Sequence, residues 1–197
     1  VAESRGEEVK RTAECQVDIR IDAHIPEKYI PSLAQRLDVY KKIAAVESEE
    51  FSNMGTTLVS AIMDGDHAVL VNVGDSRAYR VNADGIWQMT RDHSLVQMMV
   101  DRGELSPEVA RTYPGKNFIT RAIGTEPMGI CDIYHKEVNK GDYLLLCSDG
   151  LSNVMDDQEI LFEVAHGVNK QHCCQRLLEI AKNRGAPDNV TSILIMI

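Results

Sequence analysis

A series of short apolar segments between residues 58 and 89 constrains the fold more than any other feature of the chain. Each segment is four to six residues long, which suits a β-strand and is too short for a typical helix. Two of the intervening turns contain Asp-Gly, at residues 64–65 and 84–85, the dipeptide that favours tight hairpin turns. We therefore predict an antiparallel meander, with strands at 58–63, 68–73, 78–81 and 86–89.

Two further segments have the pattern of buried strands. Residues 143–147 form an uninterrupted apolar run, and residues 190–197 are almost entirely apolar. Such runs are typical of strands that are covered on both faces. Strands mixed with amphipathic helices indicate an α+β fold built as a sandwich. The helices are predicted at 95–102, from Ser106 onward, at 156–165 and at 171–184, with Gly185 ending the last one.

The first fifty residues differ in character from the rest of the chain. Residues 17–21 alternate between apolar and polar side chains, as in a half-buried strand. Pro31 is followed by Ser32, a residue that favours a helix N-terminus, and apolar side chains then recur at helical spacing. We predict a strand, a turn and a helix at residues 33–49.

Composition and charge exclude several classes of protein. With 44% hydrophobic and 26% charged side chains in 197 residues, the chain is globular rather than disordered. Its 30 acidic and 21 basic side chains give a net charge of −9, which argues against nucleic acid as a partner. The apolar runs are far shorter than the roughly 20 residues that span a bilayer, and the first residues lack a signal-peptide pattern. We therefore expect a cytoplasmic protein with no membrane segment and with reduced cysteines.

Three aspartates stand where predicted strands meet turns: Asp75, Asp149 and Asp188. Asp149 follows one buried strand and Asp188 precedes another, so antiparallel pairing of these strands would bring both carboxylates to one sheet edge. Carboxylate oxygens on a rigid edge suit Mg²⁺ or Mn²⁺ better than zinc. The alternative for each aspartate alone is ordinary turn chemistry, since Asp before Gly or Asn is common in turns.

Two other polar residues, a histidine and an arginine, are candidates for roles at such a site. His93 lies between Asp92 and Ser94, and we expect a loop histidine bonded to a neighbouring carboxylate rather than a proton carrier. Arg77 could offer a bidentate fork to phosphate. Trp87, the sole tryptophan, is predicted to lie in the core.

Six motifs resemble, in order and spacing, those of the PPM family of metal-dependent Ser/Thr protein phosphatases (type 2C) in its bacterial form. The resemblance covers about residues 51–197 and implies an α-β-β-α sandwich that hydrolyses phosphoserine and phosphothreonine in proteins with a metal-activated water. It also implies that Asp149 and Asp188 bind Mn²⁺ or Mg²⁺, and that Asp75 binds a third, weaker ion. Residues 93–124, called the flap segment below, resemble the flap beside the family's cleft. The resemblance also implies a structural role for Arg77. The motifs are Met-Gly-Thr-Thr-Leu at 54–58, Val-Gly-Asp-Ser-Arg-Ala-Tyr at 73–79, Asp-His-Ser at 92–94, Ile-Gly at 123–124, Leu-Cys-Ser-Asp-Gly-Leu at 146–151 and Asp-Asn-Val-Thr at 188–191.

The sequence also departs from that family at its front. It contains no counterpart of the family's early motifs, which are a phosphate-gripping Arg, a Glu-Asp pair and an Asp-Gly-x-Gly-Gly-His stretch with the bridging metal ligand. One preorganised electrostatic contact is commonly worth about 3 to 4 kcal/mol of transition-state stabilisation, so we expect low turnover from an N-terminally incomplete domain. A sandwich without its early strands would also have an uncovered sheet edge, through which we expect a homo-oligomer to form.

Residues 9–47 resemble instead the opening part of the C-terminal domain of the bacterial transcription-repair coupling factor, a protein-contacting domain. The segments that carry this resemblance are 17–19, 25–31 and 35–44. We accordingly divide the chain into a strand-turn-helix segment at 1–50 and a phosphatase-type domain at 51–197. Two other functions stay open: a non-catalytic module that binds metal or phosphopeptide, and a repair-factor interaction fragment.

Overall fold

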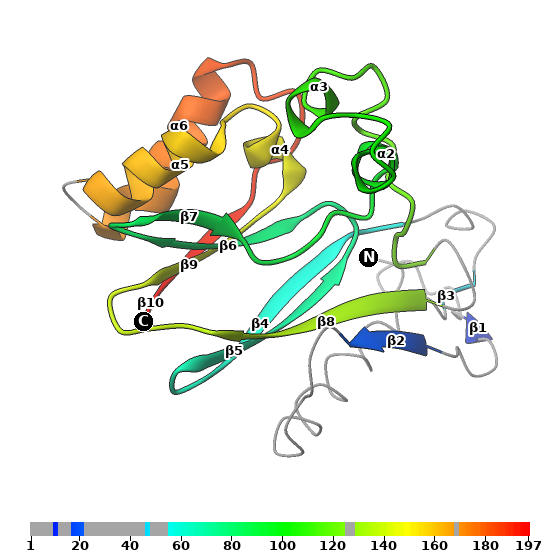
Figure 1. The fold of residues 1–197 in the computed structure, drawn as a ribbon, viewed down its shortest axis with the longest axis horizontal. Helices are drawn as coiled ribbons and strands as arrows, with labels where there is room; N and C mark the ends of the chain where they lie inside the picture. Colours follow the sequence, from blue (N-terminus) through cyan, green and yellow to red (C-terminus); the bar gives the residue numbers. More distant parts are fainter. Residues whose placement is uncertain (1–9, 12–16, 22–45, 48–54, 125–128, 168–169) are drawn as a thin grey trace.

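Two four-stranded sheets lie face to face, and helices cover the outer side of one of them (Figure 1). The structure is a computed structural model that describes residues 10–11, 17–21, 46–47, 55–124, 129–167 and 170–197. The α+β class predicted from the sequence is confirmed. Its helices are α2 (Leu95–Asp101), α3 (Pro107–Ala110), α4 (Asp149–Ser152), α5 (Asp157–Leu161) and α6 (Cys173–Asn183).

The first sheet has the strand order β2-β8-β5-β4. A tight turn joins β4 (Leu58–Asp64) to β5 (His67–Val73), and β5 pairs antiparallel with β8 (Gly129–Glu137). The strand predicted at 17–21 is confirmed as β2 (Val17–Ile21), which pairs parallel with β8. A segment from the first fifty residues therefore extends this sheet.

The second sheet has the strand order β10-β9-β6-β7, with every neighbouring pair antiparallel. It consists of β6 (Arg77–Asn82), β7 (Gly85–Gln88), β9 (Tyr143–Cys147) and β10 (Ser192–Met196). The four strands predicted between 58 and 89 all form, but the continuous meander is wrong. They make two hairpins in different sheets, because the chain leaves β5 at Gly74 and crosses to the other layer.

Gly74 makes this crossing possible. Its φ of +101° lies in the left-handed region, which costs glycine little and strains other residues. A Cβ atom here would also overlap the side chain of Thr57. The turn that carries Asp75 therefore requires glycine at position 74.

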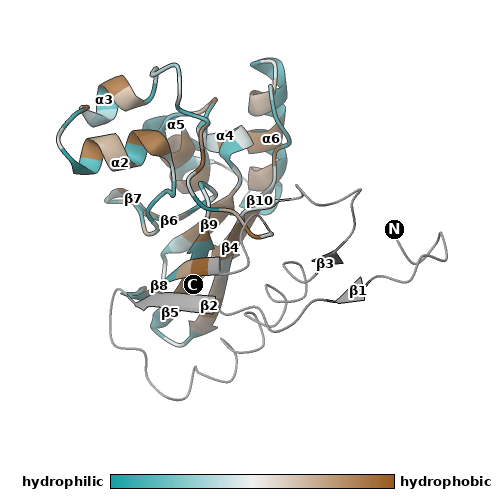
Figure 2. Ribbon diagram, turned by 90° about the vertical axis from the view of Figure 1, so that its right-hand side faces the viewer, coloured by the Kyte–Doolittle hydropathy of each residue, from teal (hydrophilic) through white to brown (hydrophobic). Residues whose placement is uncertain are grey.

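The described residues form three core clusters: one between the sheets, one beneath the helices, and one on the other face of the first sheet, where Val71 of β5 packs with Ile133 of β8. Ala68 and Leu70 of β5 meet Leu144 and Leu146 of β9 between the sheets, while Leu145 of β9 packs beneath α4, α5 and α6. In Figure 2 the central strands carry hydrophobic residues, whereas hydrophobic and hydrophilic residues alternate along α6. Because β9 contributes to the first two of these clusters, its apolar run at 143–147 is continuous, as predicted.

The helices confirm most of the predictions, with differences at their ends. Asp156 caps α5 in a reciprocal capping box with Glu159, and the helix continues as a π-helical turn, Phe162–His166. The end of the helix predicted at 33–49 is wrong, because Val46–Glu47 is a strand, β3, that pairs with β1 (Lys10–Arg11). The rest of that prediction lies outside the described residues.

Two exposed features concern the edges of the second sheet. Trp87 on β7 is 40% exposed beneath the guanidinium of Arg80, so its prediction as a core residue is wrong; an edge strand has too few neighbours to bury a side chain this large. On β10, Ile193 and Met196 are 53% and 65% exposed. Self-association through a sheet edge stays a prediction.

In the part of the chain that is described, no helix has the length and apolar character to cross a membrane.

Candidate metal centre

Asp149 and Asp188 are brought together by the pairing of β9 with β10. Ser192 of β10 lies opposite Cys147 of β9, so the residues that flank this pair meet at the same sheet edge. Ser148 forms two hydrogen bonds with the loop before β10. Its backbone N–H donates to Thr191 O at 3.0 Å, and its hydroxyl donates to Asn189 O at 3.1 Å. The predicted convergence of the two segments is confirmed.

Gly150 allows the closest approach within this edge. A Cβ atom at this position would overlap the carbonyl oxygen of Asn189 and lie 2.9 Å from its carbonyl carbon. Both atoms belong to the backbone, so no side-chain rotation could relieve the contact. The Asp-Gly sequence at 149–150 is therefore required by the neighbouring loop and not by a hairpin turn.

Asp75 approaches the same place from the crossing between the sheets. Burial, followed by the charge of Asp149, raises the pKa of the Asp75 carboxyl to about 6. Burial, followed by the charge of Asp188, raises the pKa of Asp149 in turn. Asp149 is thus the electrostatic neighbour of both other aspartates, and negative charge accumulates around it.

The raised pKa of Asp75 makes the stability of the metal-free chain depend on pH. Between the ordinary value of 3.8 and the folded value of about 6, the folded chain binds more protons than the unfolded chain. The stability that this carboxyl contributes is therefore complete below pH 3.8 and is lost as the pH rises through 6. We expect the free energy of unfolding to fall as the pH rises across this window. In Asp75→Asn the contribution of this carboxyl to the fall is expected to be absent. Urea unfolding at several pH values measures it; identical pH profiles for the two proteins would contradict the assignment.

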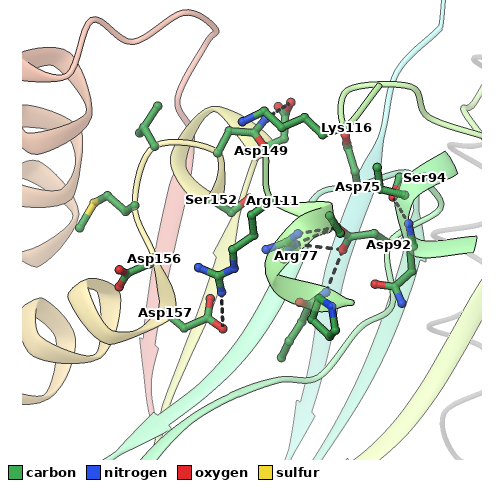
Figure 3. A pocket seen from close by; sticks show the side chains of 18 of the residues that line it. Asp75, Arg77, Asp92, Ser94, Arg111, Lys116, Asp149, Ser152, Asp156 and Asp157 are labelled. Carbon is green, nitrogen blue, oxygen red and sulfur yellow. Dashed lines mark hydrogen bonds and ion pairs between the residues drawn. The ribbon is translucent and has the colours of Figure 1, made fainter. Parts of the chain in front are cut away.

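A cleft of about 520 Å³ opens beside these aspartates. The flap segment contributes one wall, which includes Arg111 and Lys116, and the opposite wall comes from α4 and α5. Asp75 and Asp149 line the cleft. Figure 3 shows Arg111 reaching across it to Asp157, with 3.4 Å between the charged groups. The cleft therefore combines a carboxylate end with cationic side chains from the flap segment.

Arg77 lies in the same cleft, and each of its three guanidinium nitrogens donates a hydrogen bond within the protein. Nε and Nη2 donate to Asp92, with a shortest distance of 2.7 Å, and Nη1 donates to the hydroxyl of Tyr79 at 2.9 Å. The expected structural role of Arg77 is consistent with these contacts. Asp92 also accepts from Gln88, so this ion pair joins β6 and β7 to the start of the flap segment.

The donor chemistry of this edge fits a hard cation. Its ligand atoms would be carboxylate oxygens, and their mutual repulsion is the kind of field that a divalent ion relieves. Among the described residues, however, no three His, Cys, Asp or Glu side chains are arranged to enclose an ion. This set therefore fits an ion that keeps several water ligands, as Mg²⁺ usually does. A shared ion between Asp75, Asp149 and Asp188 stays a prediction.

Comparison with known proteins decides the family. The family model described as protein phosphatase 2C matches residues 3–180. The chain belongs to the protein phosphatase 2C family. The serine/threonine phosphatase stp of Listeria innocua is 38% identical over 160 residues, which are 80% of this chain and 64% of the relative. The serine/threonine protein phosphatase PstP of Mycobacterium tuberculosis is 38% identical over 155 residues, 77% of this chain and 29% of the relative.

Solved structures of phosphatase 2C relatives share the fold. Serine/threonine phosphatase Stp1 of Staphylococcus aureus superimposes with a TM-score of 0.80 at 35% identity, covering 89% of this chain and 71% of that one. The catalytic domain of PstP in complex with two manganese ions gives a TM-score of 0.74 at 34% identity, covering 88% and 73%. This chain spans 64% of the length of the Listeria relative.

The family match also bears on the first fifty residues of this phosphatase 2C chain. The match begins at residue 3, whereas the sequence motifs placed the start of the phosphatase-type part near residue 51. The resemblance of residues 9–47 to the transcription-repair coupling factor, and a domain boundary near residue 50, remain predictions.

Sequence reasoning missed two contacts around the site. His93 does bond to a carboxylate, as expected, but the partner is Asp132 on β8, at 3.1 Å, and not the adjacent Asp92. The apolar residues around Asp132 were a signal for the strand at 129–137, which was not predicted, and a buried aspartate within a strand needs a partner. The pair between Arg111 and Asp157 left no comparable signal, since it joins two exposed helix ends.

Proposed function

We propose that this chain is a metal-dependent protein serine/threonine phosphatase domain that uses Mn²⁺ or Mg²⁺. The observation that carries the proposal is the pairing of β9 with β10, which brings the segments of Asp149 and Asp188 to one sheet edge, beside a cleft that Asp75 and Asp149 line. The names of its relatives support the same activity, and the PstP structure with two manganese ions supports the choice of metal.

Asp149, Asp188 and Asp75 would hold the metal in this proposal. When bound, such an ion acidifies a water molecule and neutralises phosphoryl oxygens. The carboxylates are preorganised by the chain itself: Asn153 donates to Asp149 at 3.1 Å, and the backbone N–H of Asn189 donates to Asp188 at 2.6 Å. These bonds restrict both side chains before any ion binds, which lowers the entropy cost of binding.

The substrates would be proteins that carry phosphoserine or phosphothreonine. The phosphate is dianionic, and Arg111 and Lys116 place positive charge on the flap side of the cleft. Arg77 contributes less to phosphate binding, because Asp92 and Tyr79 already accept a hydrogen bond from each of its three guanidinium nitrogens. Lys116 and Arg111 therefore orient a phosphate toward the carboxylate end.

Hydrolysis of an aryl phosphate in the presence of Mn²⁺ tests the proposal. We expect Mn²⁺-dependent turnover, and its loss in Asp149→Asn, because the amide removes the charge that is central to the three aspartates. Asp84→Asn changes a turn aspartate outside the cleft and serves as the matched control. Turnover that survives Asp149→Asn would contradict the proposed site.

A non-catalytic metal- or phosphopeptide-binding module is the second candidate. It is favoured by the lack, in the described residues, of a three-ligand cluster that could enclose an ion. Absence of turnover together with a Mn²⁺-dependent rise in Tm would select the module. At an ion concentration about a hundredfold above Kd the stabilisation is roughly 2.7 kcal/mol, which thermal unfolding resolves.

A further inference from the structure

His93 is a buried ionisable side chain that the proposed chemistry does not use. Only 6% of its surface is exposed. Its Nε2 lies 3.1 Å from Asp132 Oδ2, and Arg121 Nη1 lies 2.9 Å from the other oxygen of the same carboxylate. The ring is therefore fixed from the side of the first sheet.

The opposite edge of the ring accepts a backbone hydrogen bond. The N–H of Gly74 donates to His93 Nδ1 at 3.1 Å. Since Nδ1 accepts, the ring proton sits on Nε2 and is donated to Asp132. Arg121 Nη1 also lies 3.1 Å from Nε2, but two donors do not bond, so its partner is the carboxylate. The ring is thus a neutral bridge between β8 and the turn at Gly74.

His93 forms two hydrogen bonds with the backbone of Gly74. Besides the bond to the ring, the backbone N–H of His93 donates to Gly74 O at 2.9 Å, and Asn72 Nδ2 supports the same oxygen at 3.2 Å. The Gly74 N–H belongs to the peptide before the glycine, and its carbonyl belongs to the peptide after it. Both peptide planes are therefore attached to one residue, which sets the rotation between them.

These two hydrogen bonds matter because a glycine residue does not restrict its own backbone dihedral angles. Gly74 sits at φ +101°, and a residue without Cβ has a broad choice of backbone angles. Asp75 follows directly, so the direction of its carboxylate depends on the peptide planes at Gly74. On the other side, Ser76 is held through its hydroxyl, 2.8 Å from that of Thr57. Only the Gly74 side relies on a histidine ring.

We propose that His93 is a positioning residue for Asp75, acting through the hydrogen bond from Gly74 N–H to Nδ1. The inference rests on the proposed function, in that Asp75 is taken to hold an ion. Removing this bond is expected to weaken Mn²⁺ binding at Asp75 by about 10- to 100-fold, the usual effect of an outer partner of a metal ligand.

Two substitutions separate the two edges of the ring. His93→Asn keeps an acceptor at the δ position, where it can serve Gly74, and loses the reach to Asp132. His93→Gln keeps the reach to Asp132 and loses the δ acceptor. Both are neutral and both remove the ring, so they are matched for lost packing. We expect His93→Gln to weaken Mn²⁺ binding, measured by calorimetry or Mn²⁺ spin resonance, and His93→Asn to retain most of it.

The Asp75→Asn background shows whether the effect passes through Asp75. If it does, His93→Gln has no further effect on Mn²⁺ binding once Asp75 is Asn, because the two changes are not independent. An additional loss in the double variant, or equal losses in His93→Gln and His93→Asn, would overturn the positioning role and leave a general structural one.

A measurement on the unmodified, metal-free chain needs no variant. A nitrogen–nitrogen scalar coupling between Gly74 N and His93 Nδ1, together with slow exchange of the Gly74 amide proton, reports the hydrogen bond directly. We expect both. Their absence with normal Mn²⁺ binding refutes the inference alone, whereas a detected coupling in a chain that binds no Mn²⁺ refutes the proposed function.

Discussion

Replacing Gly150 with alanine is expected to weaken Mn²⁺ binding and to destabilise the chain. The new Cβ would overlap the carbonyl oxygen of Asn189 and lie 2.9 Å from its carbonyl carbon. The loop must move away, and it carries Asp188, the residue before Asn189. Helix α4 gains at most about 1 kcal/mol in intrinsic propensity from the alanine, whereas overpacking against rigid atoms costs about 1–3 kcal/mol. The clash decides the sign.

We expect two results from Gly150→Ala. The Tm falls by several degrees, since about 1 kcal/mol corresponds to roughly 2–4 °C in a domain of this size. The affinity for Mn²⁺ falls at least about tenfold, the lower end of the effect of disturbing the groups around a metal ligand. Thermal unfolding of the metal-free protein and calorimetric Mn²⁺ titration measure the two effects separately.

Gly85→Ala is the matched control for this substitution. Its Cβ would approach only the ring of Trp87, at 3.3 Å, and a half-exposed side chain can yield where a backbone cannot. We expect unchanged Mn²⁺ affinity and a small change in Tm. Mn²⁺ binding by Gly150→Ala as tight as in the unmodified chain would show that the approach of the two loops is not what brings Asp149 and Asp188 together.

Asp92→Asn is expected to have the largest effect on stability. Asp92 is 8% exposed and accepts three hydrogen bonds from Arg77 and one from Gln88. An amide offers one acceptor oxygen and turns an N–H₂ group toward the donors of Arg77. Breaking one side of a buried ion pair costs about 3–5 kcal/mol, and the partial exposure of Arg77, 26%, favours the lower end. At about 3 kcal/mol the Tm falls by roughly 6–12 °C.

Asp157→Asn makes the same chemical change in an exposed pair. The side chains of Arg111 and Asp157 are 54% and 38% exposed, and exposed pairs contribute at most about 1 kcal/mol. We expect a drop in Tm of no more than roughly 4 °C, which added salt reduces further because it screens exposed charges. Equal losses in Asp92→Asn and Asp157→Asn would mean that the pair between Arg77 and Asp92 is not the support that its geometry indicates.

The sequence predictions were correct where the interactions act between near neighbours in the chain, and wrong where the interacting residues are far apart in it. The hairpins around the turns at 64–65 and 84–85 formed as predicted, because Asp-Gly turns and alternating apolar residues act within a few positions. Their assembly into one meander was wrong, because a strand's apolar face does not specify which sheet it joins. At Gly74 a left-handed glycine and the side chain of Thr57 direct the chain into the second layer.

The candidate site divides in the same way. The meeting of Asp149 and Asp188 was predictable, since antiparallel neighbours place the end of one strand beside the start of the next. The burial of Asp75 was not predictable, because the groups that surround it, Asp149 among them, belong to distant segments of the chain. His93 was expected to meet a carboxylate, yet its partner, Asp132, lies 39 positions away.

The strand β8 (Gly129–Glu137) was not predicted, but the sequence by itself determined the other sheet strands of residues 58–197, the hairpin turns between them and the chemistry available at the strand ends. Local hydrophobic period and turn residues are enough for that, because they act through neighbours in the chain. Only the tertiary structure decided which strands join which sheet, the contact of Arg111 with Asp157 across the cleft and the path from Asp132 through His93 to Gly74. Those arrangements depend on which distant surfaces bury one another, and many pairings satisfy the same apolar pattern until the whole core is packed.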